Sequence, residues 1–153
     1  INGGSYRIFC KKNVKKSIHY KEKTSLSDIK KFIKRVKENK ERCLAFIKKC
    51  NNENEKVFLY GASTKGNTLL QYYGIDSSMI HFASERSPEK WGKYTIGSGL
   101  KIISEKAARK LNPKYFFVMP YSFIKEFILR EKKWLKKGGK FILPYPKFKV
   151  LKN

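Results

Sequence analysis

A short apolar run followed at once by a small-residue turn constrains this chain most. Residues 57–60 are VFLY, residues 61–67 are GASTKGN, and residues 68–73 carry apolar side chains at helical spacing. A strand, a loop and a helix in direct succession form half of a βαβ unit. Such units build parallel sheets with helices on both faces. The chain is therefore expected to adopt an α/β fold.

The turn at residues 61–67 is a candidate anion-binding loop. Its glycines allow close backbone approach, and the following helix directs unpaired N–H groups and a partial positive charge at the loop. Lys65 adds a full charge that can neutralise a phosphate. The predicted binding residues of this loop are Gly61, Ala62, Ser63, Thr64, Lys65, Gly66 and Asn67. The glycine spacing matches neither G-x-G-x-x-G nor a P-loop, so a purely structural turn with glycine at a steric pinch stays open.

Length and composition limit the classes of protein to consider. The 153 residues suit one domain, and 41% hydrophobic residues supply a core. No stretch approaches the roughly 18 continuous apolar residues that span a bilayer, and no signal peptide opens the chain. We expect a soluble cytoplasmic domain without a membrane partner. Because the first residue is Ile1, a piece of a longer protein is expected.

The net charge of +24 raises nucleic acid as a partner. Residues 1–56 hold +11 of it and the other 97 residues hold +13, so the charge is spread along the chain. Only six of the 36 basic residues are arginine, the usual bidentate reader of guanine and phosphate. A lysine-rich proteome would explain the excess equally well, and nucleic acid stays an open alternative.

The cysteines and histidines predict neither a metal site nor a catalytic group. Cys10, Cys43 and Cys50 form no C-x-x-C pair, and His19 and His81 are isolated. We therefore predict no metal ligand and no catalytic residue in this chain.

The rest of the chain fits a Rossmann-like, doubly wound parallel sheet with flanking helices. A basic N-terminal stretch with a strand remnant is expected over residues 1–24, and the domain over 25–153. Apolar residues at the 3.6 period predict a long amphipathic helix over 27–50 that packs on the sheet. The sheet core is expected within 57–146, with strands near 57, 79–84, 100–103, 115–119 and 141–143 and one helix from about 122 to 137. Regular pairing is expected to end at residues 144–146.

Polar residues follow two further predicted strands. Glu85, Arg86 and Ser87 come after the second strand, and Pro120, Tyr121 and Ser122 come after the strand at 115–119. Ligands of such folds bind at the carboxyl ends of the strands, and an acid about 20 residues beyond the glycine loop commonly receives a ribose hydroxyl. These residues therefore join the predicted site, although Glu85 could instead be an exposed acid paired with Arg86.

The full sequence from residue 60 onward is more specific than the spacing of its glycines, and it resembles a known family. YGASTKGNTLL at 60–70 and YGID at 73–76 resemble the C-terminal domain of SAM-dependent sugar C-methyltransferases. The resemblance continues through GKYT at 92–95, VMPY at 118–121, Glu131 and GGKF at 138–141. It departs at Glu85, Ile96 and Tyr121–Ser122, where the family commonly has Asp, Pro and Trp followed by His or Asn.

The resemblance implies a function for the chain. In that family an upstream domain holds S-adenosylmethionine and the catalytic residues, and the C-terminal domain holds a nucleotide-sugar, typically a TDP-4-keto-deoxysugar. The chain is thus expected to be the substrate-binding part of a methyltransferase, with no cofactor of its own and no activity alone. The alternatives are a non-catalytic basic Rossmann-like module that binds nucleic acid or a protein, and an NAD(P)-dependent enzyme, which the missing G-x-G-x-x-G disfavours.

Overall fold

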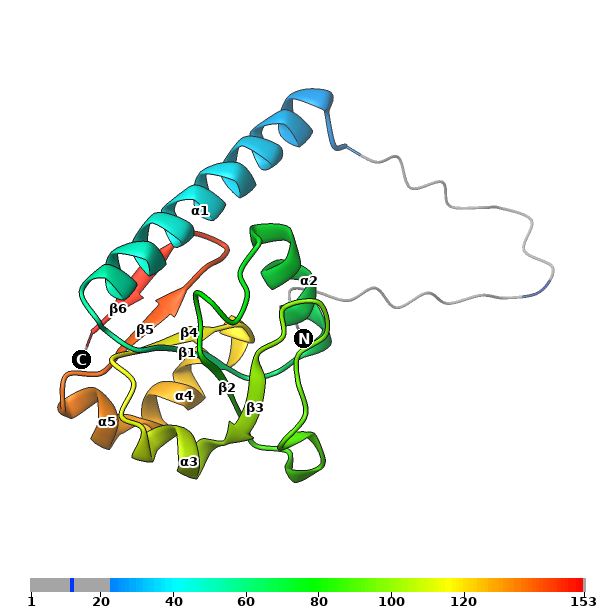
Figure 1. Ribbon diagram of the computed structural model, residues 1–153. Coiled ribbons are helices and arrows are strands. Elements are labelled where there is room, and N and C mark those ends of the chain that lie inside the picture. The colour runs from blue at the N-terminus through cyan, green and yellow to red at the C-terminus, as the bar shows by residue number, and fades with distance from the viewer. Residues whose placement is uncertain (1–11, 13–22, 153) are drawn as a thin grey trace.

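One six-stranded sheet with helices on both faces organises the computed structural model, which describes residues 12 and 23–152 (Figure 1). The strands lie in the order β3-β2-β1-β4-β5-β6, and all neighbours are parallel except β5 and β6. The strands are β1 Val57–Tyr60, β2 Phe82–Glu85, β3 Lys101–Ser104, β4 Tyr115–Val118, β5 Lys140–Leu143 and β6 Lys149–Leu151. This architecture confirms the predicted Rossmann-like α/β fold. The predicted strand within residues 2–9 lies outside the described residues.

The helices divide between the two faces of the sheet (Figure 1). They are α1 Leu26–Asn52, α2 Thr64–Tyr73, α3 Glu105–Lys110, α4 Ile124–Arg130 and α5 Lys132–Lys136, with short 3-10 turns at Pro88–Lys90 and Tyr121–Phe123. Buried side chains of α1 and α2 form one core with Leu59 and Phe117, while those of α3, α4 and α5 form a second core with Phe58 and Phe116. Successive residues of a strand point to opposite faces, so the continuous apolar runs of β1 and β4 supply both cores.

Helix α1 begins at a capping box and is buried over only part of its length. Ser25 accepts a hydrogen bond from the Asp28 N–H, and the Asp28 carboxylate accepts one from the Ser25 N–H. The C-terminal half of α1 buries Cys43 and Ile47 against the sheet. The N-terminal half extends beyond the sheet (Figure 1). The prediction that the whole apolar face of this helix packs on the sheet is therefore wrong for its N-terminal half, whose exposed apolar residues are Leu26, Ile29, Phe32 and Ile33.

Two predicted strand boundaries differ from the structure. The second strand starts at Phe82 rather than 79, because the Met79 and Ile80 N–H groups bond to the Asp76 carbonyl in a helical turn. Pairing does not end at 144–146 either, since β6 returns antiparallel to β5. The Asn39 side chain of α1 holds this return: its Nδ2 donates to the Pro146 carbonyl at 2.9 Å, and its Oδ1 accepts from the Phe148 N–H at 3.1 Å.

The predicted helix over 122–137 is divided into a 3-10 turn and two short helices. The break between α4 and α5 falls at Glu131. Its carboxylate is buried and accepts a hydrogen bond from Tyr60, the last residue of β1. The apolar residues of this segment predict that Phe123, Phe127, Ile128 and Leu135 face inward, and of these four Phe127 and Leu135 are buried. Phe123 and Ile128 are exposed: Phe123 lies in the 3-10 turn before α4, and Ile128 follows Phe127 directly in α4, so the two side chains point about 100° apart around the helix.

Two isoleucines of α1 test the division of this helix. Ile47 is fully buried and Ile33 is 46% exposed. We expect Ile47→Ala to lower the free energy of unfolding by about 2–5 kcal/mol, because it leaves a cavity in the core. Ile33→Ala should change it by less than about 0.5 kcal/mol. Urea unfolding followed by circular dichroism measures both, and equal losses for the two variants would contradict the assignment.

Candidate functional site

The candidate site lies where strand connections reverse direction. β1 and β4 are neighbours, yet β1 continues into α2 on one face of the sheet and β4 leads into α4 on the other. Their carboxyl ends carry Gly61 and Pro120. A crevice forms at such a switch point and is the usual ligand site of open α/β sheets. The structure therefore brings three predicted segments to the edge formed by the carboxyl ends of the parallel strands. They are the 61–67 loop, residues 85–87 and residues 120–122.

The N-terminus of α2 presents unpaired backbone donors at this edge. Ser63 caps the helix: its Oγ accepts from the Gly66 N–H at 3.1 Å, and its carbonyl accepts from the Asn67 N–H at 3.0 Å. Within the described part of the chain, the N–H groups of Thr64 and Lys65 have no acceptor. The Lys65 side chain is exposed beside them. This end of α2 therefore combines free donors, the helix dipole and a full positive charge.

Both glycines of the loop allow close approach to the protein's own chain. Gly61 has φ +88°, and a Cβ there would lie 3.2 Å from Pro120 Cγ. A Cβ on Gly66 would meet Ser63 Oγ at 3.0 Å and the Met119 side chain at 3.2 Å. The loop thus needs glycine for packing between β1, α2 and the end of β4, as the structural alternative expected.

Glu85 ties the end of β2 to this loop. Its Oε2 accepts from the Ala62 N–H at 2.9 Å, and its Oε1 accepts from the N–H groups of Arg86 and Ser87 at 2.8 and 3.0 Å. Lys90 Nζ lies 3.5 Å away. The side chain is 11% exposed and pairs with Lys90, so the alternative of an exposed acid paired with Arg86 is wrong. Burial of the carboxylate raises its pKa, but hydrogen bonds from Ser87, Ala62 and Arg86 outweigh that effect, and the net pKa is lowered.

Two cavities open on either side of the loop. The larger, about 470 Å³, is lined by apolar residues such as Phe127 together with polar and charged ones, which include Ser84, Glu85, Arg86, Lys90 and Arg130. The smaller, about 320 Å³, has a mainly apolar wall built from Met119, Pro120, Phe123 and Tyr145. Ser63, Pro120 and Phe123 line both cavities. The N-terminus of α2 therefore adjoins two cavities, of which the larger carries more charged side chains.

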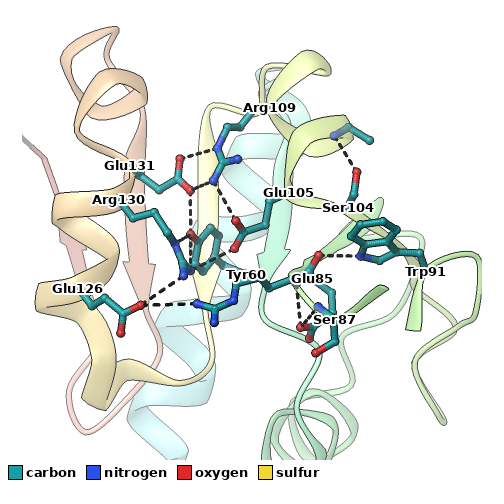
Figure 2. A network of polar contacts seen from close by, with 12 residues as sticks. Tyr60, Glu85, Ser87, Trp91, Ser104, Glu105, Arg109, Glu126, Arg130 and Glu131 are labelled. Atoms are coloured by element: carbon teal, nitrogen blue, oxygen red, sulfur yellow. Dashed lines mark hydrogen bonds and ion pairs between the residues drawn. The ribbon is translucent and has the colours of Figure 1, made fainter. Parts of the chain in front are cut away.

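Six charged side chains and Tyr60 form a connected network beside the larger cavity (Figure 2). The charged members are Arg86, Glu105, Arg109, Glu126, Arg130 and Glu131. Tyr60 donates to Glu131 Oε1 at 2.8 Å and accepts from Arg130 Nη2 at 2.9 Å. Arg109 donates to both carboxylate oxygens of Glu131, with Nε 2.9 Å from Oε2, and its Nη2 lies 3.1 Å from Glu105 Oε2. Arg130 also pairs with Glu105 at 3.1 Å. Every buried charge of the network thus has an opposite partner.

This network fixes the protonation of Tyr60 and Arg109 near neutral pH. Burial, followed by the charge of Glu131, raises the pKa of Tyr60 far above its usual value. Hydrogen bonds to Glu131 raise the pKa of Arg109. Tyr60 is therefore a neutral donor and Arg109 a permanent cation, so neither group serves as a base.

The remaining predicted residues occupy the rim of the site. Arg86 and Ser87 line the larger cavity and Ser122 the smaller one. Tyr121 lies against the Tyr145 ring with centroids 4.9 Å apart. This charged network was not predicted from the sequence, although the placement of the arginines could have indicated it. Three of the six arginines in a lysine-dominated chain gather here: Arg86, Arg109 and Arg130.

The described part of the chain offers no metal site, membrane-spanning helix or reactive thiol beside this site. No group of three or more His, Cys, Asp or Glu residues is placed to hold a metal ion there. No described helix is both long and apolar enough to cross a membrane. Cys43 and Cys50 are buried free thiols, and burial raises their pKa values to about 12 and about 11. These thiols are poor nucleophiles near neutral pH.

Comparison with known proteins adds two findings. Residues 1–146 match the family model described as the C-methyltransferase C-terminal domain. A C-methyltransferase of Streptomyces niveus, NovU, is 35% identical over 99 residues, which are 65% of this chain and 24% of that protein. The matched region thus spans about a quarter of the relative's length.

Glu85→Gln tests whether this carboxylate holds the loop. The folded-state pKa is lowered, so the stabilisation is present above the unfolded value near 4.5 and is lost as pH falls through the lower folded-state value. At pH 7 we expect Glu85→Gln to cost about 1–3 kcal/mol of unfolding free energy, because an amide cannot accept all three N–H groups. The difference from wild type should shrink below about pH 4. Denaturant unfolding across pH measures it.

Glu89→Gln is the matched control, because Glu89 is an exposed carboxylate in the same loop. It should change the unfolding free energy by less than about 0.5 kcal/mol at any pH. A Glu85→Gln effect that stayed constant down to pH 3 would show that the carboxylate charge does not stabilise the loop.

Proposed function

This chain belongs to the family of C-methyltransferase C-terminal domains, and we propose that it binds the nucleotide-sugar substrate of such an enzyme. The ligand is a nucleoside diphosphate-sugar, of the TDP-keto-deoxysugar type that the sequence resemblance implies. The observation that carries the proposal is the exposed N-terminus of α2 between two cavities. A diphosphate joins two groups of unlike polarity, and this site offers an anion-binding helix end flanked by two cavities of unlike lining.

We place the diphosphate of the ligand at residues 63–67. The free N–H groups of Thr64 and Lys65 supply uncharged donors, and the helix end supplies a partial positive charge. Lys65 has no acidic partner among the described residues, so its charge is available to a phosphate. Arg86 and Lys90 lie in the lining of the larger cavity, but each is paired with a carboxylate, so among the described residues the free positive charge of the site is at Lys65.

The residues that line the site bind and orient, and none of them carries out methyl transfer. Carbon methylation beside a carbonyl needs a base that removes a proton from carbon. The carboxylates of Glu85 and Glu105 are each paired with a cation, and Tyr60 is a buried neutral donor. We assign S-adenosylmethionine and the catalytic groups to another part of the parent enzyme, as the resemblance implies, and regard this chain as inactive alone.

A basic module that binds nucleic acid is the alternative from another class. It would neutralise many phosphates through the dispersed lysines, and its affinity would fall steeply with salt. The local arrangement at α2 favours a ligand with one or two phosphates.

Lys65→Ala tests the placement of the diphosphate. A charged hydrogen bond contributes roughly 1.5–3 kcal/mol, so the variant should bind TDP or UDP about tenfold to a hundredfold more weakly. Lys133→Ala removes an equally exposed charge from α5, which ends where β5 begins at the opposite edge of the sheet, and should leave affinity unchanged. Calorimetric titration separates the readings: no binding at millimolar nucleotide, or equal affinity of wild type and Lys65→Ala, would refute the proposal.

The chain by itself should neither bind S-adenosylmethionine nor methylate a sugar. Calorimetry with S-adenosylmethionine should give no binding heat under conditions in which TDP binds. Incubation of the chain with a TDP-keto-sugar and S-adenosylmethionine should yield no methylated product by mass spectrometry. Turnover above background would move the catalytic groups into this chain.

A further inference from the structure

Ser84 is a buried polar residue of the larger cavity whose hydroxyl is unpaired. It is the third residue of β2 and is 2% exposed. Its Oγ has no hydrogen-bond partner among the residues that the structure describes. A buried hydroxyl without a partner costs stability, so its presence calls for a reason.

The strand register directs Ser84 into the cavity. Ser84 lies beside Tyr60 in the β1–β2 pairing, and both residues line the cavity. Ala83, the residue before it, packs into the opposite core with α1 and α2. Since side chains alternate along a strand, Ser84 faces the side of α3 and α4, where Glu105 and Arg130 form the cavity wall.

The neighbouring groups of the cavity are already engaged. The Glu85 carboxylate is held by three N–H groups, and Arg130 is shared among Tyr60, Glu105 and Glu126. Ser84 Oγ thus differs from the polar groups around it, because its capacity both to donate and to accept is unused.

The two cavities also differ in what they fit. Pro120 and Phe123 line both cavities. The larger cavity adds charged groups and serine hydroxyls to them, which suit a ring that bears several oxygens. The smaller cavity adds Met119 and Tyr145, which suit the face of a nucleobase. Because both meet at Ser63, a diphosphate at α2 would place one half of the ligand in each.

On the basis of the proposed function, we propose that the sugar of the nucleotide-sugar occupies the larger cavity and hydrogen-bonds to Ser84 Oγ, with the base in the smaller cavity. Ser84 is then a sugar-binding residue. Its hydroxyl costs stability in the free protein and is satisfied by a sugar hydroxyl or carbonyl oxygen in the complex.

Ser84→Ala and Ser98→Ala form a matched pair for the test. Ser98 is 3% exposed, and its Oγ lies 2.7 Å from Thr95 Oγ1. Ser98→Ala should lower Tm because it removes a satisfied hydrogen bond, whereas Ser84→Ala should leave Tm unchanged or raise it. In calorimetric titrations, Ser84→Ala should weaken binding of TDP-glucose about threefold to tenfold and leave TDP affinity unchanged. Ser98→Ala should leave the ratio of the two affinities unchanged.

Three results would overturn the inference. They are an unchanged TDP-glucose affinity in Ser84→Ala, an equal loss for TDP and TDP-glucose, and a fall in Tm like that of Ser98→Ala. Each leaves the diphosphate site intact if Lys65→Ala still weakens TDP binding. Failure of the wild-type chain to bind TDP would instead remove the proposed function, and this inference with it.

Discussion

The buried carboxylate of Glu131 is the constraint on which the site half of the molecule depends. At 2% exposure it needs compensation, and Arg109 and Tyr60 provide it from α3 and β1. The break between α4 and α5 occurs at this residue, and its carboxylate contacts Tyr60 at the carboxyl end of β1. Because Tyr60 also accepts from Arg130, one interaction fixes the end of β1, the position of α3 and the wall of the larger cavity.

A second set of contacts holds the 61–67 loop on its other side. Glu85 joins β2 to Ala62, Lys90 Nζ donates to the Ala62 carbonyl at 3.2 Å, and Trp91 Nε1 donates to the Glu85 carbonyl at 2.9 Å. With Gly61 packed against Pro120, the loop is held from both neighbouring strands. Donors that are fixed before a ligand arrives lose less entropy on binding, which is the advantage of preorganisation.

Local patterns predicted the elements, and long-range pairing explains what they missed. The strands β1 and β4 and the helices α1 and α2 follow from apolar periodicity and caps within a few residues. By contrast, Tyr60 and Glu131 are 71 positions apart, and Asn39 holds Pro146 across 107 positions. A sequence pattern over a few neighbouring residues does not reveal that the helix breaks at Glu131 or that its carboxylate binds Tyr60. Likewise, Pro144 and Pro146 indicate a stop to pairing, whereas Asn39 stabilises the turn that lets β6 return along β5.

The net charge of the chain and the charges of the site act over different distances. The net +24 attracts any polyanion from a distance, and salt screens this attraction beyond about 8–10 Å. Inside the larger cavity Glu85, Glu105 and Glu126 offset Lys90, Arg130 and Arg86, so the cavity itself is nearly balanced. An anionic group gains most at the end of α2, where Lys65 and free N–H groups face no carboxylate in the described residues. A nucleotide-sugar carries its negative charge on the diphosphate and uncharged hydroxyls on the sugar. The unpaired positive groups at the end of α2 match the diphosphate, and the charge-balanced larger cavity matches the sugar.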